Sequence, residues 1–126
     1  MYLWTHENWA QVNVQKVDLI PSALGFPETV DLEASSIVIS EDGEVQALAL
    51  VFTDTDIPCL ISETVSRHDV EGERIVEGCV RRSLDALASR SINAVEFDGH
   101  ASDPHFFPNW MKLRPTGKRF RIVEVE

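Results

Sequence analysis

The sequence predicts an α+β fold, in which a mostly antiparallel sheet of four to five strands carries one principal helix on one face. Three observations predict it. Residues 70–90 have the apolar spacing of an amphipathic helix, residues 36–52 have the pattern of a β-hairpin, and a further apolar run at 92–97 follows the helix. The chain of 126 residues suits one domain, 1–126, and its apolar fraction of 44% allows a core of ordinary size.

The N-terminal residues favour a strand followed by a loop. Ala10, Val12 and Val14 alternate with polar residues, as in a half-buried strand, while a helix beginning after Asn8 is the alternative. Residues 21–35 contain two prolines and a glycine, which indicates a connecting loop.

The clearest β-hairpin of the chain precedes the helix. Asp42 and Gly43 form a favourable tight-turn pair between strand-forming runs at 36–40 and 44–52. From Ala47 to Phe52 the second run is apolar on both faces, which is typical of a central strand covered on both sides. The helix is the natural cover for one of those faces.

The helix prediction depends on periodicity. The opposite half of a wheel drawn at 100° per residue carries Glu77, Arg81 and Asp85, which form two i,i+4 pairs of opposite charge. Gly72 and Gly78 each lower the stability of the helix by about 1 kcal/mol relative to alanine, so packing must supply most of that stability. The apolar half supplies that packing through Ile75, Val76, Cys79, Val80, Leu84, Ala86 and Leu87.

The C-terminal third is less regular. Residues 98–117 contain three prolines and are long for a loop in a compact domain, so we expect either a functional loop or partial order from a short helix. Asp103-Pro104 or Asn109 can start such a helix. Residues 119–125 alternate in the manner of an edge strand.

The net charge of −10 is unevenly distributed. Residues 1–66 hold eleven acidic side chains and one basic, whereas residues 67–126 hold ten of each. The overall sign disfavours nonspecific binding to nucleic acid or to an anionic membrane. Within the neutral half, five bases occur with no acid between them, which is typical of a solvated edge strand whose charge prevents aggregation: Lys112, Arg114, Lys118, Arg119 and Arg121.

Cysteine content and hydropathy suggest a location. Cys59 and Cys79 lack a CxxC spacing, so we expect free thiols in a reducing compartment, with a single disulfide as the alternative. The N-terminus has no basic segment followed by an apolar one, and the longest apolar run is far too short to span a bilayer. A cytoplasmic protein is expected.

Two groups of carboxylate and imidazole side chains are candidate ligands for a divalent metal. Asp54 and Asp56 directly follow the most apolar strand and can share a cation such as Mg²⁺. The second group combines imidazole and carboxylate, which suit Zn²⁺, Mn²⁺ or Fe²⁺. It consists of four side chains within eight positions: Asp98, His100, Asp103 and His105.

One topology would bring these groups together. If strands 44–52 and 92–97 are parallel neighbours joined through the helix, their C-terminal ends share an edge of the sheet. The candidate site is then Asp54, Asp56, Asp98 and His100, and it would support a metal-dependent hydrolase.

A third candidate combines aromatic and basic side chains in segment 106–121: Phe106, Phe107, Trp110, Lys112, Arg114 and Arg119. Aromatic rings beside cations can stack bases and hold phosphates of a single-stranded nucleic acid. The simpler interpretation is that the aromatics cap an open end of the core. A further possibility is that the segment docks on an acidic partner, and the acidic half of a second copy qualifies.

The chain contains no phosphate-cradling glycine loop, no Gly-x-Ser-x-Gly and no HExxH motif. We therefore expect a non-catalytic interaction or ligand-binding module that needs no cofactor, contacts no membrane and associates with a protein partner or with itself. The alternatives are the metal-dependent hydrolase and nucleic-acid binding. The relation between strands 44–52 and 92–97 distinguishes the hydrolase from the module.

Overall fold

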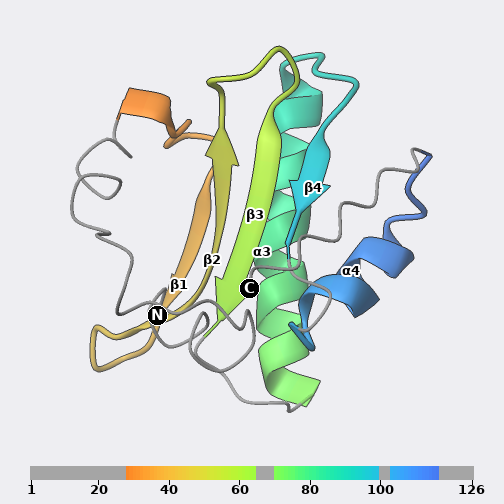
Figure 1. The fold of residues 1–126 in the computed structure, drawn as a ribbon. Helices are drawn as coiled ribbons and strands as arrows, with labels where there is room; N and C mark the ends of the chain where they lie inside the picture. The colour runs from red at the N-terminus through yellow and green to blue at the C-terminus, as the bar shows by residue number, and fades with distance from the viewer. Residues whose placement is uncertain (1–27, 65–69, 100–102, 117–126) are drawn as a thin grey trace, which may run out of the picture.

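The structure, a computed structural model, describes residues 28–64, 70–99 and 103–116. It confirms the predicted α+β fold. A four-stranded sheet has the order β1-β2-β3-β4, with α3 lying across one face and α4 beyond β4 (Figure 1). The elements are β1 (Ser36–Ile39), β2 (Val45–Phe52), β3 (Cys59–Thr64), α3 (Val70–Ser89), β4 (Glu96–Asp98) and α4 (Phe106–Lys112).

The predicted hairpin is formed by β1 and β2. These strands are antiparallel, and a bulge interrupts their register between Val38 and Ile39. Gly43 turns the chain between them with a φ of 85°, a conformation that glycine adopts without steric cost. β2 continues the antiparallel arrangement with β3, from the pair Ala47–Thr64 to the pair Phe52–Cys59.

The parallel pair of the sheet is β3 with β4, since α3 connects those two strands. The sequence had raised strands 44–52 and 92–97 as possible parallel neighbours, and this arrangement is wrong. β3 lies between β2 and β4, and β2 runs opposite to β4. The C-terminal end of β2 therefore lies at the same edge of the sheet as the start of β4, with β3 between them.

The core lies between the sheet and α3. Inward-facing positions alternate along β2 and β3, so that residues 47, 49, 51 and 60 are fully buried. Three predicted positions of the helix, Val76, Val80 and Leu87, are each 1% exposed, and Cys79 is buried with them. Neither Cys59 nor Cys79 forms a disulfide, as predicted.

The solvent face of α3 carries one of the two expected charge pairs. Arg81 binds Glu77 with 2.7 Å between Nη2 and Oε1, and among the described residues it makes no ion pair with Asp85. The buried face includes a polar contact that joins the helix to the sheet, since Ser83 Oγ lies 3.0 Å from Ser36 Oγ of β1.

Other predictions have mixed outcomes. The strand expected at 92–97 is shorter and later, Glu96–Asp98, and residues 98–117 contain the short helix α4. The strands expected near residues 10–14 and 119–125 lie outside the described residues. In the part of the chain that the structure describes, no helix has the length and hydropathy needed to cross a membrane.

Candidate functional site

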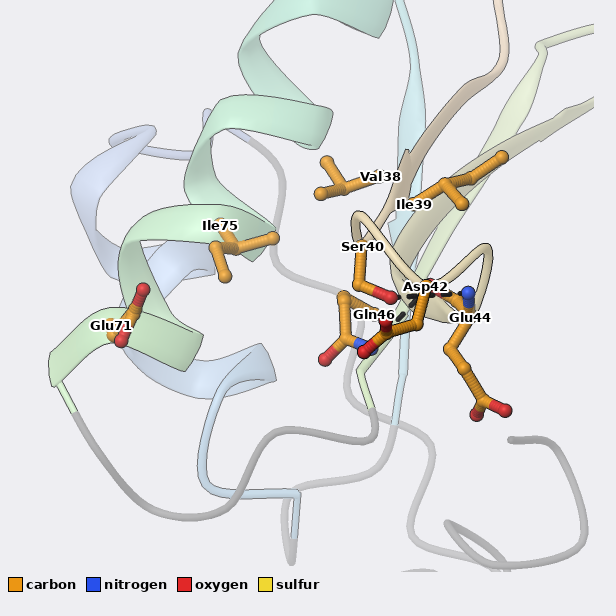
Figure 2. A pocket seen from close by; sticks show the side chains of 8 residues that line it. All are labelled: Val38, Ile39, Ser40, Asp42, Glu44, Gln46, Glu71 and Ile75. Carbon is orange, nitrogen blue, oxygen red and sulfur yellow. Dashed lines mark hydrogen bonds between the residues drawn. The ribbon is translucent and has the colours of Figure 1, made fainter.

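A hollow of about 500 Å³ lies between the β1–β2 hairpin and the start of α3 (Figure 2). Strand β1 and its turn form one wall, and the first two turns of α3 form the other. The lining residues are Val38, Ile39, Ser40, Asp42, Glu44, Gln46, Glu71 and Ile75.

The lining of the hollow has a marked chemical character. Val38, Ile39 and Ile75 are apolar, three other side chains are carboxylates, and none is basic. Figure 2 shows Glu71 on the α3 side and Asp42 on the hairpin side, whereas the carboxylate of Glu44 points away from α3. Such a surface favours a group that combines a positive charge with an apolar stem.

The carboxylates of the hollow are available for a ligand. Asp42, Glu44 and Glu71 are all exposed. Within residues 28–64, 70–99 and 103–116 none of the three forms an ion pair, because every ion pair found there belongs to other residues. Local structure holds the turn that presents two of them, since Ser40 Oγ accepts a hydrogen bond from the Glu44 amide at 3.1 Å.

A second surface lies on α4 at the other edge of the sheet. Helix α4 turns Phe106 inward, where its ring packs edge-on against Phe97 of β4 at 5.0 Å between centroids. Phe107 stacks on Trp110 at 5.8 Å, and Phe107 and Met111 are 43% and 54% exposed. We call Phe107, Trp110 and Met111 the aromatic face.

The basic residues predicted to bind beside these aromatics have different surroundings. Lys112 donates hydrogen bonds to Glu73 and to Glu77 of α3, the latter at 2.9 Å. The bond from Lys112, followed by that from Arg81, lowers the pKa of Glu77, and the two glutamates raise the pKa of Lys112. Arg114 is exposed, and Arg119 lies outside the described residues. Among the described residues, Arg114 is therefore the one predicted basic side chain next to the aromatic face that forms no ion pair.

The structure describes three of the four candidate metal ligands. Asp54 and Asp56 lie in the turn between β2 and β3, and Asp98 is the last residue of β4. His100 lies outside the described residues. Among the residues that are described, no three His, Cys, Asp or Glu side chains are grouped in a way that could hold a metal ion. The four-residue metal site remains a prediction.

Cys59 lies among several of these carboxylates. Burial, followed by the charges of Asp98, Glu96 and Asp54, raises the pKa of its thiol to about 11. The thiol is therefore protonated near neutral pH and is a poor nucleophile, since the thiolate is the reactive form.

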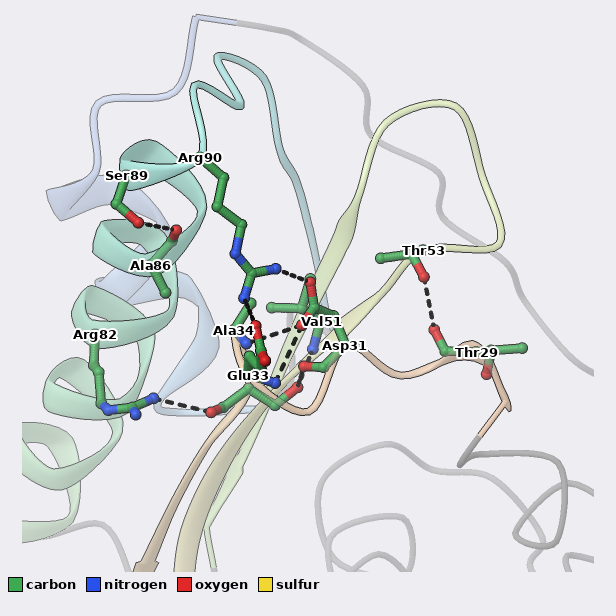
Figure 3. A network of polar contacts seen from close by, with 11 residues as sticks. Thr29, Asp31, Glu33, Ala34, Val51, Thr53, Arg82, Ala86, Ser89 and Arg90 are labelled. Atoms are coloured by element: carbon green, nitrogen blue, oxygen red, sulfur yellow. Dashed lines mark hydrogen bonds and ion pairs between the residues drawn. The ribbon is translucent and has the colours of Figure 1, made fainter.

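An ion-pair cluster that the sequence analysis did not identify joins the end of α3 to the turn before β1 (Figure 3). Arg90 donates hydrogen bonds to Asp31 and, at 3.0 Å, to Glu33. Asp31 also accepts the backbone amides of Glu33 and Ala34. We call Arg90, Asp31 and Glu33 the Arg90 clamp. Arg90 lies 59 residues from Asp31 and 57 from Glu33, so no local motif indicates the cluster.

The hollow was also missed by sequence reasoning. Its only local signal is the acidic turn at 41–44, which indicates a hairpin but not a hollow. Glu71 and Ile75 join it through the packing of α3, which brings their side of the helix to the hairpin.

Comparisons with known proteins show the fold alone. No protein-family model matches this chain, and no curated protein matches it. One solved structure is similar, a crystal structure of a mutant of TTHA1254 from Thermus thermophilus. The two chains are 17% identical with a TM-score of 0.51, over 97% of this chain and 92% of that one.

Proposed function

We propose that this protein is a non-catalytic interaction module of the cytoplasm that receives a cationic side chain of a protein partner in the hollow, and that it also associates with itself. The observation that carries this proposal is the lining of the hollow. Three exposed carboxylates lie beside apolar side chains in this lining, and within the described residues none of the three forms an ion pair. Arginine and lysine side chains carry an apolar stem and a charged end, which match the two parts of that lining.

Two further observations support a binding role. The acidic half of the chain carries a net charge of −10, which accelerates the approach of a basic partner. The Ser40–Glu44 hydrogen bond holds the backbone of the turn that carries Asp42 and Glu44, so this wall of the hollow is formed before a ligand arrives.

The test uses n-butylguanidinium, an analogue of the arginine side chain, titrated into isotope-labelled protein. We expect the amide resonances of residues 38–46 and 71–75 to shift, with an affinity in the millimolar range that weakens about tenfold as salt screens the carboxylates. Butanol and pentanoate, which keep the apolar stem without the positive charge, serve as the ligand controls.

A pair of variants checks the position of the probe. Glu71→Gln should weaken binding severalfold, since it removes a charge from the lining. Asp85→Asn removes the same charge from an exposed position about four turns further along α3 and should leave binding unchanged. Equal shifts with butanol, or shifts away from the hollow, would contradict the proposal.

A further inference from the structure

The molecule presents two exposed surfaces that each contain apolar side chains beside charges with no ion-pair partner among the described residues. On β1, Ile37 and Ile39 are 56% and 55% exposed on the face of this edge strand that is turned away from α3, and Ile39 also lines the hollow. On α4, Phe107 and Met111 are exposed in a similar way, next to Arg114. The first surface is negative and the second positive, so they are complementary both in charge and in apolar content.

The two surfaces cannot meet within one chain. β1 and β4 form opposite edges of the described sheet, and α4 packs beyond β4 (Figure 1). Helix α3 separates them as well. Glu71 and Glu73 are two residues apart and therefore point about 200° apart around the helix. Glu71 lines the hollow, whereas Glu73 binds Lys112 of α4.

We propose that the partner of the hollow is a second copy of this chain, whose aromatic face docks against Ile37 and Ile39 while its Arg114 enters the hollow between Asp42 and Glu71. This inference rests on the proposed function, because it names the occupant of the same hollow. Lys112 remains bound to α3, which fixes α4 and leaves Arg114 as the contributing cation.

The contact is heterologous, since different surfaces of the two copies meet. Because the two surfaces lie at opposite edges of the sheet, the contact either closes copies into a ring or propagates from copy to copy in an open chain. Both arrangements raise the mass with concentration, and both weaken with salt because the charges concerned are exposed.

The test measures molar mass by sedimentation over a range of protein concentrations and salt. The wild type should associate, and Glu71→Arg and Arg114→Glu should each weaken association by about tenfold or more through like-charge contact. The double variant carrying both changes should recover most of the loss, because the two charges are exchanged. Asp85→Arg is the matched control on α3 and should associate as the wild type does. Circular dichroism and melting establish that each variant is folded.

The outcomes separate this inference from the proposed function. Association that neither reversal weakens, or that the double variant does not restore, overturns the inference. A wild type that stays monomeric while n-butylguanidinium binds the hollow also overturns it. That result contradicts the proposed self-association and leaves the proposed binding of cationic side chains in the hollow standing. Association that follows the charge exchange, in a protein that does not bind the guanidinium probe, supports the inference and contradicts the view of the hollow as a general site for cationic side chains.

Discussion

Gly78 and Gly99 show how differently two glycines can depend on their surroundings. A Cβ added at Gly78 would meet nothing within 4 Å, whereas one added at Gly99 would run into the ring of Phe106. Gly78→Ala should therefore raise the free energy of unfolding by about 0.5–1 kcal/mol, through helix propensity. Gly99→Ala should lower it by about 1–3 kcal/mol, because Phe106 must move.

Urea unfolding of the two variants beside the wild type measures both changes. Because the substitution is the same, each variant serves as the control for the other. Equal effects would show that Phe106 does not lie over Gly99 as the structure places it.

The buried residues show what periodicity could and could not predict. The apolar face of α3 was predicted from spacing alone, and Val76, Cys79, Val80 and Leu87 are buried in it. Ser83 is fully buried as well, but a serine scores as polar in any helical pattern. Its partner is the hydroxyl of Ser36, 47 residues away, and only the tertiary structure can show that this polar group is satisfied.

The Arg90 clamp joins the end of α3 to the turn before β1, and it makes the free energy of unfolding depend on pH. Partial burial raises the pKa of Asp31, but hydrogen bonds from the Ala34 amide and from Arg90 outweigh this and hold the pKa below its usual 3.8. The folded state thus binds the Asp31 proton less tightly than the unfolded state does. The stabilisation is complete above the unfolded pKa and is lost as the pH falls through the folded one.

Asp31→Asn should therefore lower stability at neutral pH by about 1–2 kcal/mol and flatten its decline in acid. Glu33→Gln is the matched control. Glu33 binds the same Arg90, but its side chain is 89% exposed, compared with 18% for Asp31, so its loss should cost less than about 0.5 kcal/mol. Thermal melts between pH 7 and pH 2 measure both, and parallel acid profiles for wild type and Asp31→Asn would refute the assignment.

Strand β3 explains why one element of the sheet was not assigned from sequence. Its inward positions are Leu60, Ser62 and Thr64, two of them hydroxyls, while Cys59 and Ile61 point to the other face. A half-buried strand is usually predicted from apolar inward residues that alternate with polar outward ones, and polar residues at buried positions reverse that pattern. Thr64 is tolerated there because its hydroxyl donates to the Gln46 carbonyl at 2.8 Å.

At the scale of the whole molecule, the fold class was predictable but the strand order was not. The sequence indicated a helix between strands, and such a connection is typical of a parallel pair. Because β3 was unassigned, the strand before the helix could be 44–52, and only under that condition would Asp54, Asp56, Asp98 and His100 lie at one edge. One unassigned strand thus determined which carboxylates could be grouped into a candidate site from the sequence.

Helix α3 packs against β1, β2 and β3, so its buried face forms one side of the core that these strands share. Leu87 is 1% exposed within that face, whereas Leu84 is only partly buried at its border. Leu87→Ala should therefore cost about 2–5 kcal/mol, the lost transfer energy of the side chain plus a cavity between helix and sheet. Leu84→Ala should cost less, because solvent can fill part of the space that it leaves.

Urea unfolding followed by circular dichroism and by tryptophan fluorescence measures these two costs. The two probes should give the same midpoint in each variant if the helix and the sheet unfold as one unit. An ordinary surface substitution changes the free energy of unfolding by less than about 0.5 kcal/mol. A loss that small in Leu87→Ala would show that this side of α3 does not pack in the core. Because the hollow and the aromatic face are both positioned by α3, a large loss in Leu87→Ala would also mean that folding and binding depend on the same helix.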